Sequence, residues 1–223
     1  MRVLVGRQAP GQALRSLSRW AQVVPFWAPL LPHAALQGHA DLFVAQVGDT
    51  LLMAPNAPAE ALALPHLRGI TPVGGAIASL GAYNVSVGNR LAIGHAGRMD
   101  AALRPALAGF HLVSVRQGMA RCAALTLDDD AVITSDGGIA KALRSEGREV
   151  LWVSPLDIAL PGYRHGCLGG CCGKHGGVVY LMGSLRRHRD GLAIAAFIRR
   201  HGMETEELCD GPMLDVGSLF FVP

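Results

Sequence analysis

The sequence predicts an α/β protein made of five similar units that close into a ring. A β-hairpin followed by a helix recurs along the chain, and turn residues and helix caps recur with it. The second strands of the hairpins begin near residues 50, 90, 131, 178 and 219, a spacing typical of repeat proteins. The first strand lacks a hairpin partner and the last strand lacks a helix, so pairing of the two ends would complete a fifth unit.

The hairpins are predicted from turn chemistry. Gly-Asp and Gly-Asn between two apolar runs tolerate a positive φ, which tight turns require. The expected hairpins are Leu42–Val47 with Thr50–Ala54, Asn84–Val87 with Arg90–Ile93, Ala123–Leu127 with Ala131–Thr134, and a looser turn through 173–177 into Val178–Met182.

Helices and closing strands follow the hairpins. Ser135 or Asp136 is expected to cap a helix over Gly137–Glu146, and Asp190 one over Gly191–His201. Further helices are expected over Gln12–Trp20, over Pro58–Arg68 and from Asp100 onward. The closing strands are expected at Ile70–Val73, Phe110–Val115 and Glu149–Val153, with Arg2–Val5 beside Ser218–Val222.

Composition narrows the class of protein. Of 223 residues, 50% are hydrophobic and 17% charged, which fits one folded domain over residues 1–223 and excludes a disordered chain. A net charge of +3 with 5% aromatic residues does not indicate nucleic-acid binding. The apolar stretch Ala21–Leu31 contains two prolines and is too short to span a membrane. We therefore expect a cytoplasmic protein.

The residue that enters each hairpin should point toward the axis of the ring. These residues are Asp41, Tyr83 or Asn84, Cys122, His165 or Cys167, and Asp215. Two carboxylates can hold a guanidinium or amine through charge-assisted hydrogen bonds. A histidine beside a cysteine can lower the thiol pKa or move a proton. The set predicts an axial ligand pocket.

The segment from His39 to Val44, followed by Gly48 to Leu52, resembles the first signature block of the guanidino-group-modifying enzymes. These include arginine deiminases, dimethylarginine dimethylaminohydrolases and amidinotransferases. The resemblance implies the pentein fold, an α/β propeller of five ββαβ-like repeats around a pseudo-fivefold axis, with Asp41 binding the guanidinium. The ribosomal anti-association initiation factor shares this fold without that chemistry.

Several motifs are similar to those of a bacterial family of unknown function that is assigned the same fold. They are Gly38–Asp41, Gln117–Cys122, Ile133–Asp136, Leu160–Tyr163, Gly169–Gly173 and Asp210–Ser218. That family has no established activity, so this similarity implies the fold and leaves the function open.

The chain departs from the enzymes where their chemistry resides. Their nucleophilic cysteine lies at the start of the last strand, where this chain has Asp215, and a carboxylate is the poorer nucleophile. Standard arginine deimination is therefore not expected. His165 stands at the position of their catalytic histidine and Cys167 at that of its paired aspartate. Arg121 and Cys122 occupy the place of a glutamate.

The segment from His165 to His175 holds three cysteines and two histidines and allows three interpretations. It could bind a soft-ligand metal, although adjacent cysteines are not a usual chelating spacing. It could supply a reactive thiol, or form a glycine-rich structural turn with cysteine as a small hydrophobe.

Our hypothesis is an enzyme, or a former enzyme, that binds a small cationic or amide-bearing ligand in the axial pocket. The candidate catalytic residues are His165, Cys167 and Cys122. The candidate binding residues are Asp41, His39, Asp215, Asn84, Cys171 and Cys172. We expect a small-molecule partner, no nucleic acid or membrane, and no metal or cofactor; the oligomeric state is open. The alternative is a non-catalytic binding protein with the same fold.

Overall fold

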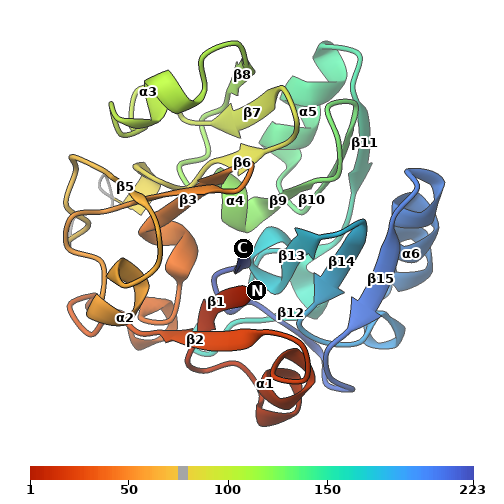
Figure 1. Cartoon of the computed structure of the whole chain (residues 1–223). Coiled ribbons are helices and arrows are strands. Elements are labelled where there is room, and N and C mark those ends of the chain that lie inside the picture. The colour runs from red at the N-terminus through yellow and green to blue at the C-terminus, as the bar shows by residue number, and fades with distance from the viewer. Residues whose placement is uncertain (75–79) are drawn as a thin grey trace.

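The computed structural model describes residues 1–74 and 80–223. Five three-stranded sheets surround an axis, and the two longest helices, Gly137–Ser145 and Gly191–Arg200, lie at the periphery of the ring (Figure 1). Each sheet combines an antiparallel pair with one parallel strand. This arrangement is the predicted five-unit α/β propeller.

Four units follow one another along the chain. The first has β3 (Val44–Val47), β4 (Thr50–Met53), α2 (Ala59–Leu62) and β5 (Leu67–Arg68), and the second has β6 (Ser86–Val87), β7 (Leu91–Gly94), α3 (Leu103–Ala106) and β8 (His111–Ser114). The third has α4 (Ala120–Ala123), β9 (Ala124–Thr126), β10 (Ala131–Thr134), α5 (Gly137–Ser145) and β11 (Glu149–Trp152). The fourth has β13 (Cys172–His175), β14 (Val178–Leu181), α6 (Gly191–Arg200) and β15 (Glu204–Glu207).

The fifth unit is assembled from both ends of the chain. Strand β1 (Arg2–Gly6) pairs antiparallel with β17 (Leu219–Val222), with Arg2 opposite Val222. Strand β1 also pairs parallel with β2 (Gln22–Phe26), and helix α1 (Gly11–Leu17) connects these two strands along the chain. Figure 1 shows both chain ends at the centre of the ring. The predicted pairing of the terminal strands is confirmed.

The helix caps confirm one expectation and correct another. Asp136 caps α5 by accepting a hydrogen bond from the Ile139 amide at 2.8 Å. Asp190 stands at the N-cap of α6 but makes no side-chain cap bond. Its Oδ2 instead accepts from the Ser154 amide at 2.8 Å and so joins two units.

The expected helix over Pro58–Arg68 is wrong in extent. Only Ala59–Leu62 is helical, and Leu67–Arg68 forms the closing strand that we expected at Ile70–Val73. Pro65 accounts for the difference, because proline disfavours a helical conformation in the residue before it and cannot supply a helical N–H. The strand therefore begins soon after this proline.

Several elements of the fold have no clear signal in the sequence. Strand β2 lies within the proline-containing stretch Ala21–Leu31. Strand β15 is a run of exposed polar residues without the alternation that identifies a strand. A two-stranded pair, β12 (Ile158–Ala159) with β16 (Met213–Leu214), lies between the units. Short 3-10 helices cover Ala34–Leu36, Ala40–Leu42, Pro155–Asp157, Gly169–Cys171 and Leu185–Arg187.

The inner strands are almost completely buried. Every residue of β7, β9, β10 and β17 is buried, which suits strands enclosed on both faces. This packing fixes the segments that enter the hairpins, and those segments carry the candidate site. No helix among the described residues is both long enough and apolar enough to cross a bilayer.

Candidate functional site

Asp41 is the centre of a buried polar cluster on the axis. It lies in the 3-10 turn Ala40–Leu42 that leads into β3. Its Oδ2 accepts a hydrogen bond from the Cys122 thiol at 3.0 Å and another from the Ser218 hydroxyl at 2.8 Å. These two donors come from the third and fifth units, so the carboxylate joins three units. We call His39, Asp41, Asn84, Cys122, Asp215 and Ser218 the axial cluster.

Asn84 connects the second unit to this cluster. Its Nδ2 donates to the Asp41 carbonyl at 2.9 Å, and its Oδ1 accepts from the Cys122 amide at 3.1 Å. Of the two alternatives that the sequence left open, Asn84 therefore faces the axis. The Tyr83 hydroxyl donates to the Thr71 carbonyl at 2.7 Å and lies outside the cluster.

His39 lies between two carboxylates. Its Nδ1 is 3.7 Å from Asp41 Oδ1 and its Nε2 is 3.6 Å from Asp215 Oδ1. The Cys122 sulfur is 3.7 Å from Nδ1. The His39 imidazole therefore lies directly beside the Cys122 thiol. From the sequence, His39 was expected to take part in ligand binding only.

Asp215 comes from the segment before the last strand, as the repeat pattern predicts. Its Oδ2 accepts from the Cys167 amide at 2.8 Å and its Oδ1 from the Gly217 amide at 3.2 Å. Position 170 beside this carboxylate requires glycine, because a Cβ on Gly170 would overlap the Asp215 side chain. A Cβ on Gly217 would overlap the His39 backbone, and Gly217 has φ +77°.

The charges of the cluster follow from burial and mutual contact. Burial alone would lower the pKa of His39, but Asp215 and Asp41 outweigh it and raise that pKa. Burial would raise the pKa of Asp41, yet the nearby imidazole and charge of His39 and the hydrogen bonds from Cys122 and Ser218 lower it. Burial raises the pKa of Asp215 to about 6 against the opposing effect of His39. The cluster thus favours an imidazolium held by carboxylates.

The Cys122 thiol has the opposite tendency. Burial, followed by the charges of Asp41 and Asp215, raises its pKa well above the ordinary cysteine value. The thiol therefore keeps its proton at rest and donates it to Asp41.

Three polar groups at and beside the cluster lack hydrogen-bond partners. His39 Nε2 and Asp41 Oδ1 are buried and unpaired, and so are both amide atoms of Gln8. The Gln8 amide packs against Gly38, the neighbour of His39. Buried polar groups are almost always satisfied, so these atoms are candidates for contacts with a ligand or water. No sequence signal singled out Gln8.

The structure also adds Ser218 and Arg121 to the site. Ser218 has φ +70° and is the one non-glycine residue with a positive φ in the described chain. Strained backbone of this kind concentrates at functional sites. Arg121 donates to the carbonyls of Gly169 and Cys172 at 2.8 Å each. Gly169 O also accepts from Ser218 Oγ at 3.1 Å, which links Arg121 to the cluster.

Three side chains of the cluster could hold a metal ion. His39, Asp41 and Cys122 each offer one ligand atom, and these atoms all lie within 4.8 Å of one another. Tetrahedral zinc, with bonds of about 2.0–2.3 Å, separates nitrogen, oxygen and sulfur ligands by roughly 3.3–3.6 Å. The imidazole's second nitrogen faces Asp215, as in carboxylate–histidine–zinc arrangements.

The remaining candidates lie around the cluster. His165 is partly buried, with Nδ1 3.0 Å from the Gly166 carbonyl. The thiols of Cys171 and Cys172 donate to the carbonyls of Cys167 and Leu168 at 3.4 and 3.1 Å, and both side chains belong to the apolar core. Of the three interpretations of this segment, these contacts favour the structural turn. Cys167 is the one partly exposed cysteine of the five, all of which are free.

Comparison with solved structures defines the class of fold. The chain has the pentein fold of the guanidino-group-modifying enzymes. It is similar to a dimethylarginine dimethylaminohydrolase variant from Pseudomonas aeruginosa complexed with citrulline, with a TM-score of 0.54, 8% identity and coverage of 92% of this chain and 91% of that one. It is also similar to a substrate-bound agmatine deiminase variant from C. jejuni, with a TM-score of 0.59, 7% identity and coverage of 98% and 92%.

Residues 5–220 match the model of a family of unknown function, DUF6873, and the chain belongs to that family. A search of curated proteins returns no match to the sequence. At the identities of the structural neighbours, the likeness establishes the fold and leaves the chemistry to be argued from the cluster itself.

Proposed function

We propose that the axial cluster binds a small cation bearing a guanidinium or amidinium group, and that Cys122 and His39 act on its C–N bond. The observation that carries this proposal is the unpaired Oδ1 of Asp41 beside the Cys122 thiol. A planar cation with several N–H groups would satisfy this oxygen and be held by Asp215 as well. Of the structural neighbours, the agmatine deiminase variant holds its substrate and the dimethylarginine dimethylaminohydrolase variant holds citrulline, so ligands with C–N bonds at such a carbon occupy proteins of this fold.

The positions of the groups suggest how each would act. The thiol proton would pass to Asp41 Oδ2, which already accepts it, as the Cys122 sulfur forms a bond to the central carbon of the ligand. The His39 imidazolium would give its proton to the departing amine as the C–N bond breaks. Water would then form a bond to the same carbon and give a proton to His39. The carbon–sulfur bond would break as the sulfur takes its proton back from Asp41, which restores both groups. The charge of the cation would favour the thiolate that the resting cluster disfavours.

The first test is calorimetric titration of agmatine, methylguanidine and neutral methylurea into the full chain. We expect the two cations to bind and methylurea to bind far more weakly. Asp41→Asn should weaken cation binding by about 1.5–3 kcal/mol, the range for hydrogen bonds to charged groups. Asp49→Asn is the matched control, because Asp49 is exposed at the β3–β4 turn. Equal losses in the two variants, or no cation binding, would disprove the proposal.

The second test separates binding from catalysis. Ammonia and amine release from the same cations should depend on Cys122 and disappear in Cys122→Ser, whereas binding should persist. Cys209→Ser is the control, since Cys209 is a buried core cysteine outside the cluster. If the wild-type chain binds the cations but releases no ammonia or amine, the proposed cation site stands and the proposed catalytic step is disproved.

A metal centre is a second candidate, favoured by the spacing of the three ligand atoms of His39, Asp41 and Cys122. Zinc would take the unpaired Asp41 oxygen and would displace the thiol proton, since the thiolate is the metal ligand. Cobalt(II), which replaces zinc and absorbs visible light, is a direct probe. A sulfur-to-cobalt charge-transfer band that is lost in Cys122→Ser and retained in Cys209→Ser would support this candidate. Absence of the band in the wild-type chain would exclude it.

A further inference from the structure

A pocket lies on the axis at the opposite end of the inner strands from the axial cluster. Its volume is about 170 Å³, and all five units contribute to its wall. The contributing segments come from the β3–β4 turn, the β6–β7 turn, β9, β13 and β17. Four of these strands or turns come shortly after a residue of the axial cluster in the sequence, so the cluster and the pocket lie at opposite ends of the same hairpins. We call this the turn-end pocket.

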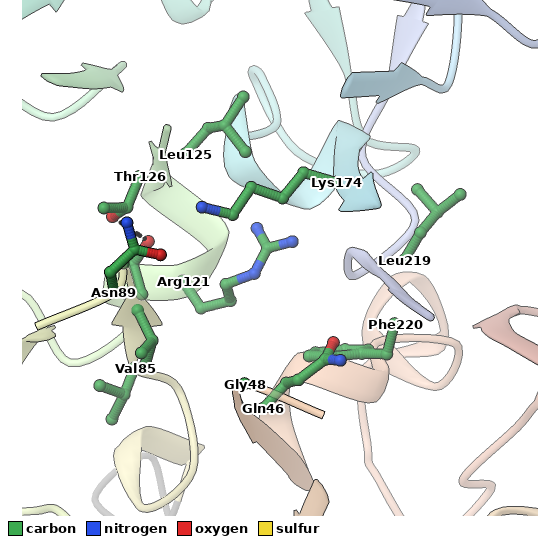
Figure 2. Close-up of a pocket in the computed structure, with 13 residues that line it drawn as sticks. Gln46, Gly48, Val85, Asn89, Arg121, Leu125, Thr126, Lys174, Leu219 and Phe220 are labelled. Carbon is green, nitrogen blue, oxygen red and sulfur yellow. Dashed lines mark hydrogen bonds between the residues drawn. The ribbon is translucent and has the colours of Figure 1, made fainter. Parts of the chain in front are cut away.

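Two cationic side chains reach into the turn-end pocket. Figure 2 shows Lys174 and Arg121 extending from two different units toward the middle of the space. No carboxylate lines the pocket, and neither cation forms an ion pair within the described part of the chain. Two like charges therefore face the same small space without a directly paired carboxylate.

Both cations retain unused donors. Lys174 Nζ donates to the Leu127 carbonyl at 2.7 Å, and Arg121 donates to two carbonyls. An ammonium has three N–H groups and a guanidinium has five, so about five donors remain between them. The charges of Asp41 and Asp215 reach Arg121 from the axial cluster, whereas Lys174 is influenced by Asp128 and Asp129. The Oδ1 atoms of Asp128 and Asp129 accept from backbone amides of residues 130, 131, 90 and 91 at 2.7–3.0 Å.

The rest of the wall suits a compact ligand. Asn89 presents an exposed amide, and the Ser86 and Thr126 hydroxyls bond to each other at 2.8 Å. Phe220 lies under the guanidinium, with Arg121 Cζ 5.7 Å from the ring centroid. Apolar side chains of Val85 and Leu125 complete the enclosure. Such a wall would partly exclude water and so strengthen charge-assisted bonds.

We infer that the turn-end pocket binds a small oxyanion, a phosphate or a carboxylate, between Lys174 and Arg121. The anion would accept the unused N–H groups and neutralise two charges that otherwise repel each other. The ligand charge is opposite to that proposed for the axial cluster. No residue of the axial cluster lines the turn-end pocket, and Arg121 borders both sites. The inference therefore does not depend on the proposed function.

Lys174 has the charge that such binding requires. Burial, and then the charge of Arg121, lower its pKa to about 8, while Asp128 and Asp129 oppose the shift. The ammonium is thus mostly present at neutral pH, and an adjacent anion would raise the pKa again.

The inference is tested by calorimetric titration of sulfate, inorganic phosphate and succinate into the full chain at constant ionic strength with sodium chloride. We expect binding at about one site per chain. Lys174→Gln should weaken it about tenfold or more, the loss expected for one charge-assisted hydrogen bond, whereas Lys174→Arg should retain it. Lys141→Gln is the matched control, because Lys141 is exposed and is the other lysine of the chain.

Preference for phosphate and sulfate would identify a phosphate site, and preference for succinate a carboxylate site. As a second measurement, the preferred anion should slow acetylation of Lys174 and leave that of Lys141 unchanged, as read by mass spectrometry. This measurement uses the wild-type chain and does not depend on the folding of a variant. No binding beyond that of chloride, equal binding by Lys174→Gln with an unchanged melting temperature, or no protection of Lys174 would overturn the inference.

Discussion

The Sγ atom of Cys122 lies 3.0 Å from Oδ2 of Asp41, although 81 positions separate the two residues in the chain. The contact joins the third unit to the first and contributes to the pKa shifts of both groups. It also makes the resting thiol a hydrogen-bond donor rather than a nucleophile, which leads to the first prediction.

Iodoacetamide should not modify Cys122 in the ligand-free folded chain between about pH 6 and 8, because the thiolate is the reactive form and burial and Asp41 disfavour it. Cys167, the partly exposed cysteine, should react first, and slowly, since burial and then Asp215 raise its pKa to about 12. Mass spectrometry of the alkylated peptides checks the order. Rapid labelling of Cys122 at about pH 6 would show that the folded chain holds a thiolate.

Gln8→Leu should leave the chain as stable as before or more stable by about 1 kcal/mol. Its buried amide has no partner, so an apolar side chain of similar size removes an uncompensated desolvation penalty. If the amide serves the ligand, the same variant binds the cation more weakly. Urea unfolding and calorimetry measure the two effects.

The control is Gln12→Leu. Gln12 donates to Asp210 at 3.0 Å on the exposed surface, so its loss should lower stability slightly and leave binding unchanged. A marked loss of stability in Gln8→Leu would contradict the prediction.

Gly217→Ala and Gly202→Ala form a matched pair. Both glycines have a positive φ, +77° and +72°, so alanine should cost about 1 kcal/mol of strain at either position. Only at Gly217 does the added Cβ overlap the backbone of His39; at Gly202 it meets nothing within 4 Å. Gly217→Ala should therefore lower the free energy of unfolding by several times as much, which thermal or urea unfolding would show. Equal losses would mean that the loop moves away from His39 easily.

The pKa of His39 predicts a pH dependence of stability. Because this pKa is raised in the folded chain, the folded state holds the proton more tightly than the unfolded state. The contribution of protonated His39 to the free energy of unfolding is complete below about pH 6.5, the ordinary histidine pKa. It is lost as the pH rises through the pKa of His39 in the folded chain. Urea unfolding should thus show stability falling above that pH in the wild-type chain, and a flatter profile in His39→Asn.

His33→Asn is the control for this experiment, since His33 is exposed. Identical slopes in wild-type and His39→Asn chains would show that the imidazole is not held as a cation.

The sequence predicted the ring because repetition is visible locally. Glycine turns and helix caps mark the units, and the same register identified Asp41, Cys122 and Asp215 as axial while leaving Tyr83 or Asn84 open for the second unit. The partner of the thiol could not be read in this way. His165 matched the family position, whereas His39 adjoins Cys122 because glycines at 170 and 217 allow the fifth unit to approach closely. Such proximity depends on packing between units, for which the sequence carries no periodic signal.

The pairing of β1 with β17 also determines when the cluster can form during synthesis. Four units can fold as their residues leave the ribosome, but β1 meets its antiparallel partner only after residues 219–222 emerge. At translation rates of about 5–20 residues per second, this wait is on the order of ten seconds or more. The contact between Asp41 and Ser218, 177 positions apart, is subject to the same delay. A nascent chain that stalls before the last strand therefore exposes an unpaired β1 edge and lacks the hydroxyl that holds Asp41.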